Sequence, residues 1–327
     1  MEILKKDTYD PFIDYVKGLS IICVVLTHNL PLIVRKFSLF EFWGKQAVPI
    51  FLLMQVFHTV RYFSNGSHTL RDYFDFGKLF KRIIFPFALL ILAQLLCYFM
   101  TGDLTLKMLK YFILHGGIGP GSYYVWIYIQ FWILTPFIVL LFRKFRDKIG
   151  GQLALICVVI SIIFEILCSY INLPLPIYRL LFIRYFFLIY LGIYLYYGNN
   201  KISIWQQLLG GLGLIFLMVQ AYFQINLEPF IFSTDYEWRV AHFPTYFYVV
   251  FLLLPLIKKY YIASNLIEKI GRYSYDIFLV QMFVFTFWPK VNILHSIDNQ
   301  YIYTFLNVIV TTALSIMPVL CYKRLRS

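Results

Sequence analysis

The chain has 327 residues, of which 61% are hydrophobic and 14% are charged, and its formal net charge is +13. This composition excludes a soluble globular domain, and no polar stretch approaches the roughly 100 residues that a separate soluble domain needs. Apolar runs long enough to cross a membrane recur from end to end, so we predict an all-α polytopic membrane protein. The basic residues lie between the apolar runs, where they set membrane topology, so we expect no nucleic-acid partner.

We predict about ten transmembrane helices in a single domain that covers residues 1–327. With the N-terminus in the cytoplasm, the inner segments carry 20 of the 29 Lys and Arg residues. Because basic residues are enriched on the cytoplasmic side, both termini are expected to be cytoplasmic. No small-residue cleavage site follows the basic start, so the first span should be retained. The predicted spans are residues 13–33, 44–62, 82–100, 123–142, 152–172, 179–197, 204–224, 242–257, 274–291 and 301–322.

The first span, residues 12–29 (FIDYVKGLSIICVVLTHN), carries three ionisable side chains on one face of an apolar helix. Lys17 and His28 lie within about 20° of each other around the helix and roughly 16 Å apart along it, with Asp14 on nearly the same stripe. Such groups inside a membrane are costly and usually face a wet cavity or a bundle interior. A snorkelling Asp14–Lys17 pair and a hydrogen-bonded core His28 would give the same pattern without catalysis.

The first inner loop, residues 61–82, combines five basic residues with aromatic side chains. This composition obeys the positive-inside rule, and it could also contact anionic membrane lipid. Lys78, Lys81 and Arg82 are equally suited to the phosphates of a cytosolic nucleotide-like donor, because Arg and Lys are natural phosphate partners. The chain has no Walker motif and no GxGxxG, so an ATP-driven or dinucleotide-binding function lacks its usual phosphate cradle.

An outer glycine-rich loop and the helix after it occupy residues 114–136. Tyr123, Trp126 and Gln130 in this helix are at i, i+3 and i+7, so they share one face and could line a polar cleft. Aromatic residues at a membrane interface are also common simply as anchors.

Three further charged residues are candidates for substrate contacts. Glu165 and Arg184 lie inside predicted spans near the outer half, where a structural ion pair is at least as consistent as a catalytic role. Arg239 belongs to an outer segment, residues 233–246, whose charged and aromatic mixture suits a carbohydrate surface and is equally normal for an interfacial loop. The histidines and cysteines show no metal-ligand spacing, so we predict no metal site.

Six stretches occur in an informative order along nearly the whole chain. IDYVKGLSIICVVLTH contains an acid and then Lys-x10-His, QAVPIFLLMQVF is close to VPxFFxxSGF, and KLFKRIIFPF is a basic run before a proline. GSYYVWIYIQFWILTP, RYFFLIYLGIYL and IGRYSYDIFLVQ follow. Together they resemble the acyltransferase-3 superfamily of bacterial membrane O-acyltransferases, in the branch similar to fucose O-acetylases and intercellular-adhesin polysaccharide modifiers.

The chain departs from the family pattern in three places. Lys17 stands where Arg is commoner, and Lys78 and Lys81 are the nearest fit to an RxxR pair. Gln281 occupies a place where many members carry His. These departures bear on the donor and the acceptor more than on acyl transfer itself.

The resemblance implies transfer from cytosolic acyl-CoA, first of all acetyl-CoA, to a hydroxyl of an extracytoplasmic glycan or lipid-linked saccharide at the bacterial cytoplasmic membrane. His28 suits the role of general base for a sugar hydroxyl, and Lys17, oriented by Asp14, would bind CoA or hold the inner channel. Tyr123 or Arg184 would supply the oxyanion donor. The residues expected to bind CoA phosphates are Lys78, Lys81 and Arg82, and those expected to bind the acceptor are Tyr123, Trp126, Gln130, Glu165, Arg184 and Arg239.

Two other functions remain open at this point. A polysaccharide exporter, flippase or other secondary transporter would also have ten spans, midplane charges and aromatic outer loops. Such transporters often have two similar halves or paired broken helices, and the sequence contains no such pairing. A non-enzymatic member that scaffolds a cell-wall synthesis complex is the third possibility.

Overall fold

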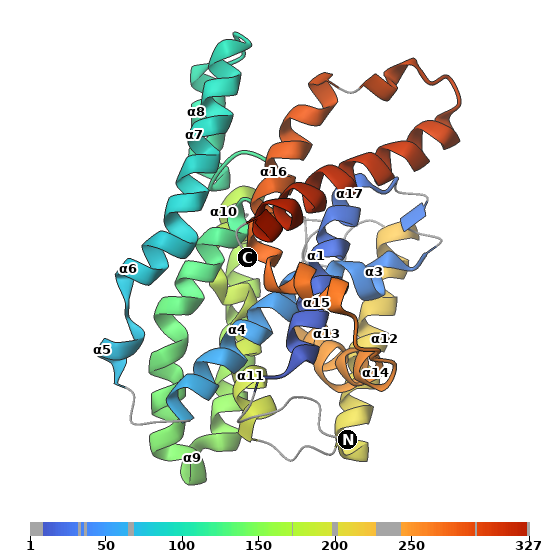
Figure 1. Cartoon of the computed structure of the whole chain (residues 1–327). Helices are drawn as coiled ribbons and strands as arrows, with labels where there is room; N and C mark the ends of the chain where they lie inside the picture. The colour runs from blue at the N-terminus through green and yellow to red at the C-terminus, as the bar shows by residue number, and fades with distance from the viewer. Residues whose placement is uncertain are drawn as a thin grey trace.

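The computed structural model describes residues 9–31, 34–35, 38–64, 69–171, 173–197, 202–226, 243–291 and 293–325. Within these ranges the regular structure is helical, and the helices pack into a bundle (Figure 1). Up to the middle of the chain the elements are α1 (Pro11–Asn29), α3 (Phe40–Trp43), the 3₁₀-helix η1 (Gly44–Gln46), α4 (Ala47–Ser64), α5 (Leu70–Tyr73), α6 (Phe76–Leu79), the π-helix η2 (Phe80–Ile84), α7 (Phe85–Met100), α8 (Leu106–His115) and α9 (Tyr123–Tyr170).

The second half continues the bundle and ends in two long helices, α16 and α17, which Figure 1 shows in orange and red. Its elements are α10 (Leu175–Leu180), the 3₁₀-helix η3 (Phe182–Tyr185), α11 (Phe187–Tyr197), α12 (Ile204–Asn226), α13 (Phe243–Tyr248), the π-helix η5 (Val249–Leu253), α14 (Leu254–Lys259), α15 (Asn265–Arg272), α16 (Ser274–Val291), the 3₁₀-helix η6 (Ile293–Ser296) and α17 (Gln300–Leu325).

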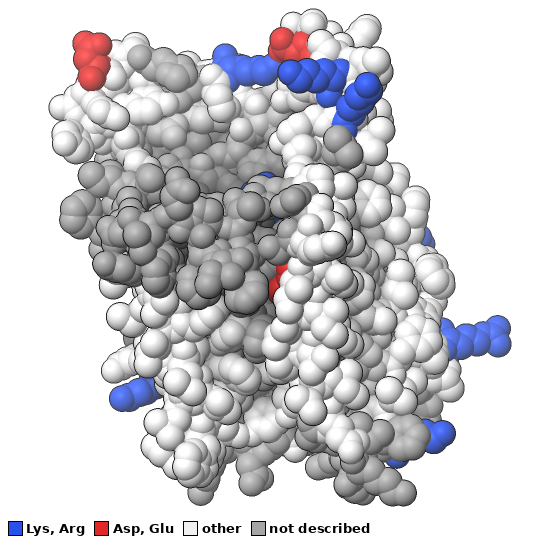
Figure 2. Space-filling model, turned by 180° about the vertical axis from the view of Figure 1, so that it is seen from behind, with Lys and Arg blue, Asp and Glu red and all other residues white. Residues whose placement is uncertain are grey.

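Several described helices have the length and apolar character of membrane spans. On the face in Figure 2, the described Lys and Arg side chains lie mainly at the upper rim and along the edges, and the described surface in the middle is mostly uncharged. This pattern is that of a membrane protein, while ten spans and cytoplasmic termini stay predictions. The helices long and apolar enough to cross a membrane are Pro11–Asn29, Leu70–Met100, Tyr123–Lys144 and Gln300–Leu325, and the shorter apolar ones are Gln152–Cys168, Phe182–Tyr197 and Ile204–Val219.

α1 begins where the sequence supplies a start signal. Asp10 accepts a hydrogen bond from the Phe12 N–H at 3.1 Å, and Pro11 occupies a first-turn position that needs no N–H donor. α1 then packs closely on α15, where a Cβ added to Gly271 would lie 1.7 Å from the carbonyl oxygen of Asp14. The two helices therefore touch backbone to backbone, which places the end of α15 beside the start of α1.

The fourth and fifth predicted spans belong to one helical element, α9, which folds back on itself. In a straight helix Tyr123 and Glu165 would be about 63 Å apart. Instead, the guanidinium of Arg184 lies 5.5 Å from the centre of the Tyr123 ring and 5.3 Å from that of Tyr178, whose hydroxyl is 3.2 Å from Glu165 Oε1. Figure 1 shows the two arms of α9 meeting at the lower end of the molecule. The two arms contain the residues of the two predicted spans.

Two other predicted spans are irregular. The sixth is divided among α10, η3 and α11 by Leu181, which has an extended backbone. The eighth passes from α13 through η5 into α14. Both π-helices, η2 and η5, are followed two residues later by a proline, Pro86 or Pro255, whose missing N–H cannot close an ordinary helical turn. The short helices α8 and α15 were not predicted, because neither contains an apolar run of span length.

Two apolar clusters hold the bundle together, and α1 contributes to both. The larger cluster joins α1, α4, α9, α11, α13 and α14 through fully buried side chains such as Phe12 and Phe57. The smaller cluster joins α1, α7, α9, α15, α16 and α17 through side chains such as Ile21 and Met282. Each such side chain stabilises the fold by about 1.5–3 kcal/mol. α1 therefore lies at the junction of the two clusters, beside the cavity described next.

Candidate active site

A cavity of about 1540 Å³ lies among the helices that meet at α1. Its wall contains residues of α1, α4, η2, the 119–122 loop, α9, α16 and α17. α1 lines it from Lys17 to His28 and α4 from Ala47 to Tyr62. Because eleven residues of helix cover about 16 Å, the cavity is long enough to bring groups from both ends of α1 into one space.

The cavity face of α1 carries Lys17 at one end and His28 at the other, with Ile21 and Val24 between them. These four residues are at i, i+4, i+7 and i+11, which is one face of a helix. The His28 side chain is exposed, and its ring lies 5.9 Å from the ring of Phe285 in α16. A polar lysine and an imidazole thus share the cavity across an apolar middle section.

α4 contributes a second imidazole, His58, which the sequence did not lead us to select. Its side chain is exposed, lines the cavity and interacts electrostatically with Lys17. Gln55, His58 and Tyr62 all line the cavity at i, i+3 and i+7, so the face analysis used for the first span would have found His58. His58 lies toward the Lys17 end of the cavity, whereas His28 is at the other end of α1.

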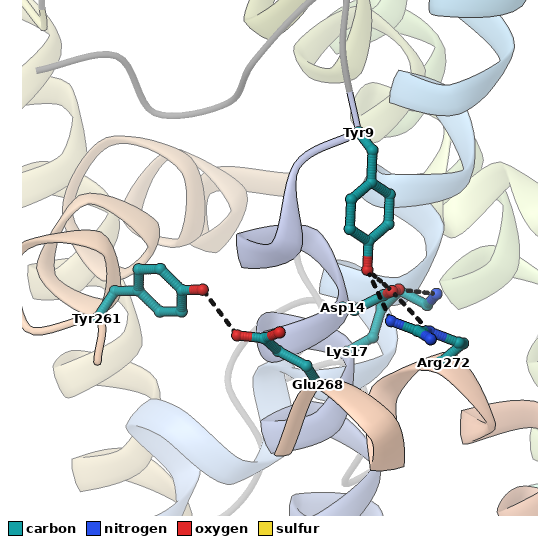
Figure 3. A network of polar contacts seen from close by, with 6 residues as sticks. All are labelled: Tyr9, Asp14, Lys17, Tyr261, Glu268 and Arg272. Atoms are coloured by element: carbon teal, nitrogen blue, oxygen red, sulfur yellow. Dashed lines mark hydrogen bonds and ion pairs between the residues drawn. The ribbon is translucent and has the colours of Figure 1, made fainter. Parts of the chain in front are cut away.

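Asp14 contacts Lys17 but does not itself line the cavity, and it interacts with several side chains (Figure 3). Its carboxylate accepts hydrogen bonds from Lys17 Nζ at 2.9 Å and from the Tyr9 hydroxyl at 2.6 Å, and Arg272 Nε lies 3.7 Å away. The bond to the carboxylate raises the pKa of Tyr9. The Asp14 side chain is only 10% exposed. Its nearly buried carboxylate therefore holds the Lys17 ammonium in place.

A neighbouring contact ties the loop before α15 to that helix. The Tyr261 hydroxyl donates to Glu268 Oε1 at 2.8 Å (Figure 3), and burial together with this bond raises the pKa of Tyr261 to about 12. Glu268 Oε1 also accepts from the Ser264 N–H at 3.2 Å. Glu268 therefore fastens the first turn of α15, the helix that ends at Arg272.

The three basic residues predicted to bind phosphate separate into two groups. Lys81 and Arg82, in η2, are exposed and line the cavity. Lys78 lies outside the lining, and its Nζ forms an ion pair at 2.9 Å with Asp75 Oδ2. Lys78 belongs to α6, whereas the two cations that line the cavity belong to the π-helix that follows it.

Two more cations reach the same end of the cavity from the C-terminal part of the chain. Arg272 ends α15, and Lys323 lies near the end of α17, where its Nζ is 2.8 Å from Asp276 Oδ2 and 5.3 Å from the centre of the Tyr273 ring. Arg272 falls in the IGRYSYDIFLVQ stretch, but nothing in its spacing places it beside the first span, and none of the six stretches contains Lys323. We call the set Lys17, Lys81, Arg82, Arg272 and Lys323 the basic mouth.

A comparison with known proteins decides the family. A family model described as an acyltransferase domain, acyltransferase-3, matches residues 10–321. The chain belongs to this acyltransferase family. No curated protein and no solved structure matches the chain. The apolar helices and the family together indicate a membrane acyltransferase, and the branch of the family stays a prediction.

Two of the residues predicted to bind the acceptor line the cavity of this acyltransferase, Tyr123 and Arg184. The guanidinium of Arg184 is surrounded by aromatic rings, with the centre of Tyr123 at 5.5 Å and that of Tyr185 at 4.5 Å. The Arg184 carbonyl accepts a hydrogen bond from the Tyr246 hydroxyl at 2.9 Å. These contacts hold a buried cation at the cavity wall near the start of α9.

Trp126 and Gln130 lie outside the cavity lining and instead clamp the backbone next to it. Trp126 Nε1 donates to the Gly116 carbonyl at 2.5 Å, which holds the glycine-rich loop against α9. Gln130 Nε2 donates to the Leu180 carbonyl at 2.7 Å, and its Oε1 accepts from the Phe182 N–H at 3.2 Å. Both residues therefore support neighbouring segments, α10 and η3 among them.

Glu165 is also outside the cavity lining, and Tyr178 connects it with Arg184. The Tyr178 hydroxyl donates to Glu165, and its ring lies 5.3 Å from the Arg184 guanidinium. Glu165 and Arg184 therefore lie near each other, as predicted, but Tyr178 lies between them. Arg239 lies outside the residues that the structure describes.

Proposed function

We propose that this acyltransferase moves an acyl group, acetyl in the simplest case, from cytosolic acyl-CoA to a hydroxyl of an extracytoplasmic glycan or lipid-linked saccharide. The observation that carries the proposal is that one cavity contains both the basic mouth and His28, which is about 16 Å further along α1 than Lys17. A donor rich in phosphate and a hydroxyl that needs a base would bind at these two ends.

The charge of the basic mouth supports a polyanionic donor. Its five cations face two nearby carboxylates, Asp14 behind Lys17 and Asp276 beside Lys323, which leaves three positive charges in excess among the described residues. The phosphates of CoA would offset that excess through charge-assisted hydrogen bonds. The pantetheine arm would then extend along α1, past the apolar middle of the cavity, toward His28.

The acyl-transfer step needs a proton acceptor at the far end of that path. His28 takes the proton of the acceptor hydroxyl as its oxygen attacks the thioester carbonyl carbon, and the carbon–sulfur bond then breaks so that CoA leaves as a thiolate. The proton on the imidazole passes to that thiolate or to water, so the imidazole returns to its neutral form. General-base help of this kind is worth about 10²–10⁴-fold in rate. Arg184, or the Tyr123 hydroxyl, would stabilise the oxyanion.

Lys17 and Asp14 act on the donor side of this scheme. The carboxylate limits where the Lys17 ammonium can move, since the two groups are 2.9 Å apart. An oriented cation at this point would bind the donor beyond its phosphates. Lys17 therefore serves as a binding group and Asp14 as its positioning residue.

The predicted orientation of the chain decides which side of the membrane each end of the cavity faces. In the predicted orientation, which puts 20 of the 29 basic residues on the inner side, the basic mouth opens to the cytosol, where acyl-CoA is present. His28 then lies in the outer half of its helix, on the side of the acceptor. Donor and acceptor would meet within one site of a protein in the bacterial cytoplasmic membrane.

Mass spectrometry of surface polysaccharide from cells with and without the gene tests the proposal. The expected result is a mass difference equal to one acyl group per modified residue, lost when the gene is removed and restored by re-expression. Polysaccharide of unchanged mass would reject acyl transfer to surface glycan. Accumulation of unmodified polymer inside the cell would favour an exporter instead.

A further inference from the structure

The π-helix η2 is the local structure that presents the donor-binding cations. Lys81 and Arg82 are two of its five residues, Phe80–Ile84, and Pro86 follows in α7. Because Pro86 has no N–H, it cannot close the ordinary helical bond to the Arg82 carbonyl. π-helical turns are rare and occur often at functional sites. Pro86 therefore leaves the Arg82 carbonyl without its ordinary helical donor, and contacts from other helices add to the bond that the Phe85 N–H makes to the Phe80 carbonyl.

One such contact comes from α16. The Tyr275 hydroxyl donates a 2.8 Å hydrogen bond to the carbonyl oxygen of Ile83, the residue directly after Arg82. Tyr275 lines the cavity, and its ring is stacked on the Phe278 ring at an angle of 25°, with 6.3 Å between their centres. The bond thus joins the start of α16 to the last turn of η2 at the edge of the basic mouth.

We propose that Tyr275 is a positioning residue for donor binding. Its hydroxyl holds the Ile83 carbonyl and with it the π-turn, so that Lys81 and Arg82 stay directed into the cavity. The inference rests on the proposed function, because it assigns those two cations to the phosphates of acyl-CoA. Without the hydroxyl the turn can relax toward other helical geometries, and the two cations would spend less time facing the donor.

The test compares Tyr275→Phe with a matched control in purified protein, using acetyl-CoA binding and acetyl transfer as readouts. The expected result is a two- to tenfold weaker affinity for acetyl-CoA, about the effect of one neutral hydrogen bond, with kcat unchanged. Tyr248→Phe is the control, because Tyr248 also donates at 2.8 Å to a backbone carbonyl, that of Phe42, and lies outside the cavity lining. It should leave acetyl-CoA affinity unchanged.

A double-mutant cycle separates positioning from a purely structural role. In an Arg82→Gln background, Tyr275→Phe should weaken acetyl-CoA binding by clearly less than it does alone, because the two changes act on one contact. Equal effects of the Tyr275 and Tyr248 variants, or full additivity with Arg82→Gln, would overturn the inference while leaving the proposed function intact. Wild-type protein that neither binds acetyl-CoA nor transfers acetyl would reject both.

Discussion

Replacing Asp14 with Asn should lower the free energy of unfolding by more than the loss of one ordinary hydrogen bond would. The amide keeps the size of the side chain and the bond from Tyr9, but it leaves the Lys17 ammonium without its carboxylate at 2.9 Å. Removing one partner of a fully buried ion pair costs about 3–5 kcal/mol. Asp14 is 10% exposed and Lys17 is 23% exposed, so solvent recovers part of that cost. We expect a loss of about 2–3 kcal/mol in the free energy of unfolding.

Denaturant unfolding in detergent, followed by tryptophan fluorescence, measures this loss and its origin. Lys17→Met should also destabilise, by removing the cation at 2.9 Å and leaving the Asp14 carboxylate with the Tyr9 hydroxyl and the more distant Arg272. The double variant should be more stable than the sum of the two single losses predicts, by about 1–2 kcal/mol, because the pair is broken only once. Additivity of the two losses to within about 0.5 kcal/mol would refute the idea that this contact carries the stability of the site.

Three further predictions follow from other parts of the chain. Gly271→Ala should lower stability strongly and reduce expression, because its Cβ would lie 1.7 Å from a backbone oxygen of α1, whereas Gly211→Ala, with nothing within 4 Å, should be neutral or stabilising in an unfolding assay. In a cysteine-free background, Lys107→Cys should react with a membrane-impermeant thiol reagent in intact cells, and reaction only after permeabilisation would reverse the topology. The bond from Lys290 holds the pKa of Asp103 below its ordinary value of 3.8, so the charged carboxylate stabilises the fold at neutral pH. The free energy of unfolding of Asp103→Asn should therefore be lower than that of wild type at neutral pH, and this difference should shrink as the pH drops below about 4. A difference that does not change with pH would contradict this.

The sequence predicted best the features that one helix can decide. Asp14, Lys17 and His28 lie in a single span, and helical periodicity alone places the last two on one face. In the structure both line the cavity along the same side of α1. The same periodicity in α4 would have found His58, because its cavity-facing neighbours have equivalent spacing.

The rest of the site depends on packing between segments that are distant in sequence. Arg272 reaches the basic mouth because Gly18 and Gly271 let α15 touch the backbone of α1. Lys323 reaches it because α17 lies against α16. Spacing along the chain contains no information about either approach. Lys78 was expected to bind phosphate but does not line the cavity. Its side chain instead forms an ion pair with Asp75, three residues earlier in the chain.

The interruptions within helices could not be predicted from the distribution of apolar residues alone. Hydropathy separated the two arms of α9 into the fourth and fifth predicted spans, but it does not show that Leu181 interrupts the sixth predicted span. Proline gave a partial signal at Pro86 and Pro255, where a π-helix precedes each residue. A proline predicts an irregular turn before it but not the type of turn.

The most direct test of the mechanism is the rate of acetyl transfer by a His28→Gln variant, measured on a preparation whose thermal unfolding is recorded in parallel. Glutamine keeps much of the size and hydrogen bonding of His28 but cannot accept a proton near neutral pH. With His28 as the general base, this variant should fold like wild type and transfer acetyl at least about 10²-fold more slowly, and His28→Ala should be equally inactive. If the glutamine variant is well folded and transfers acetyl at close to the wild-type rate, His28 is not the base.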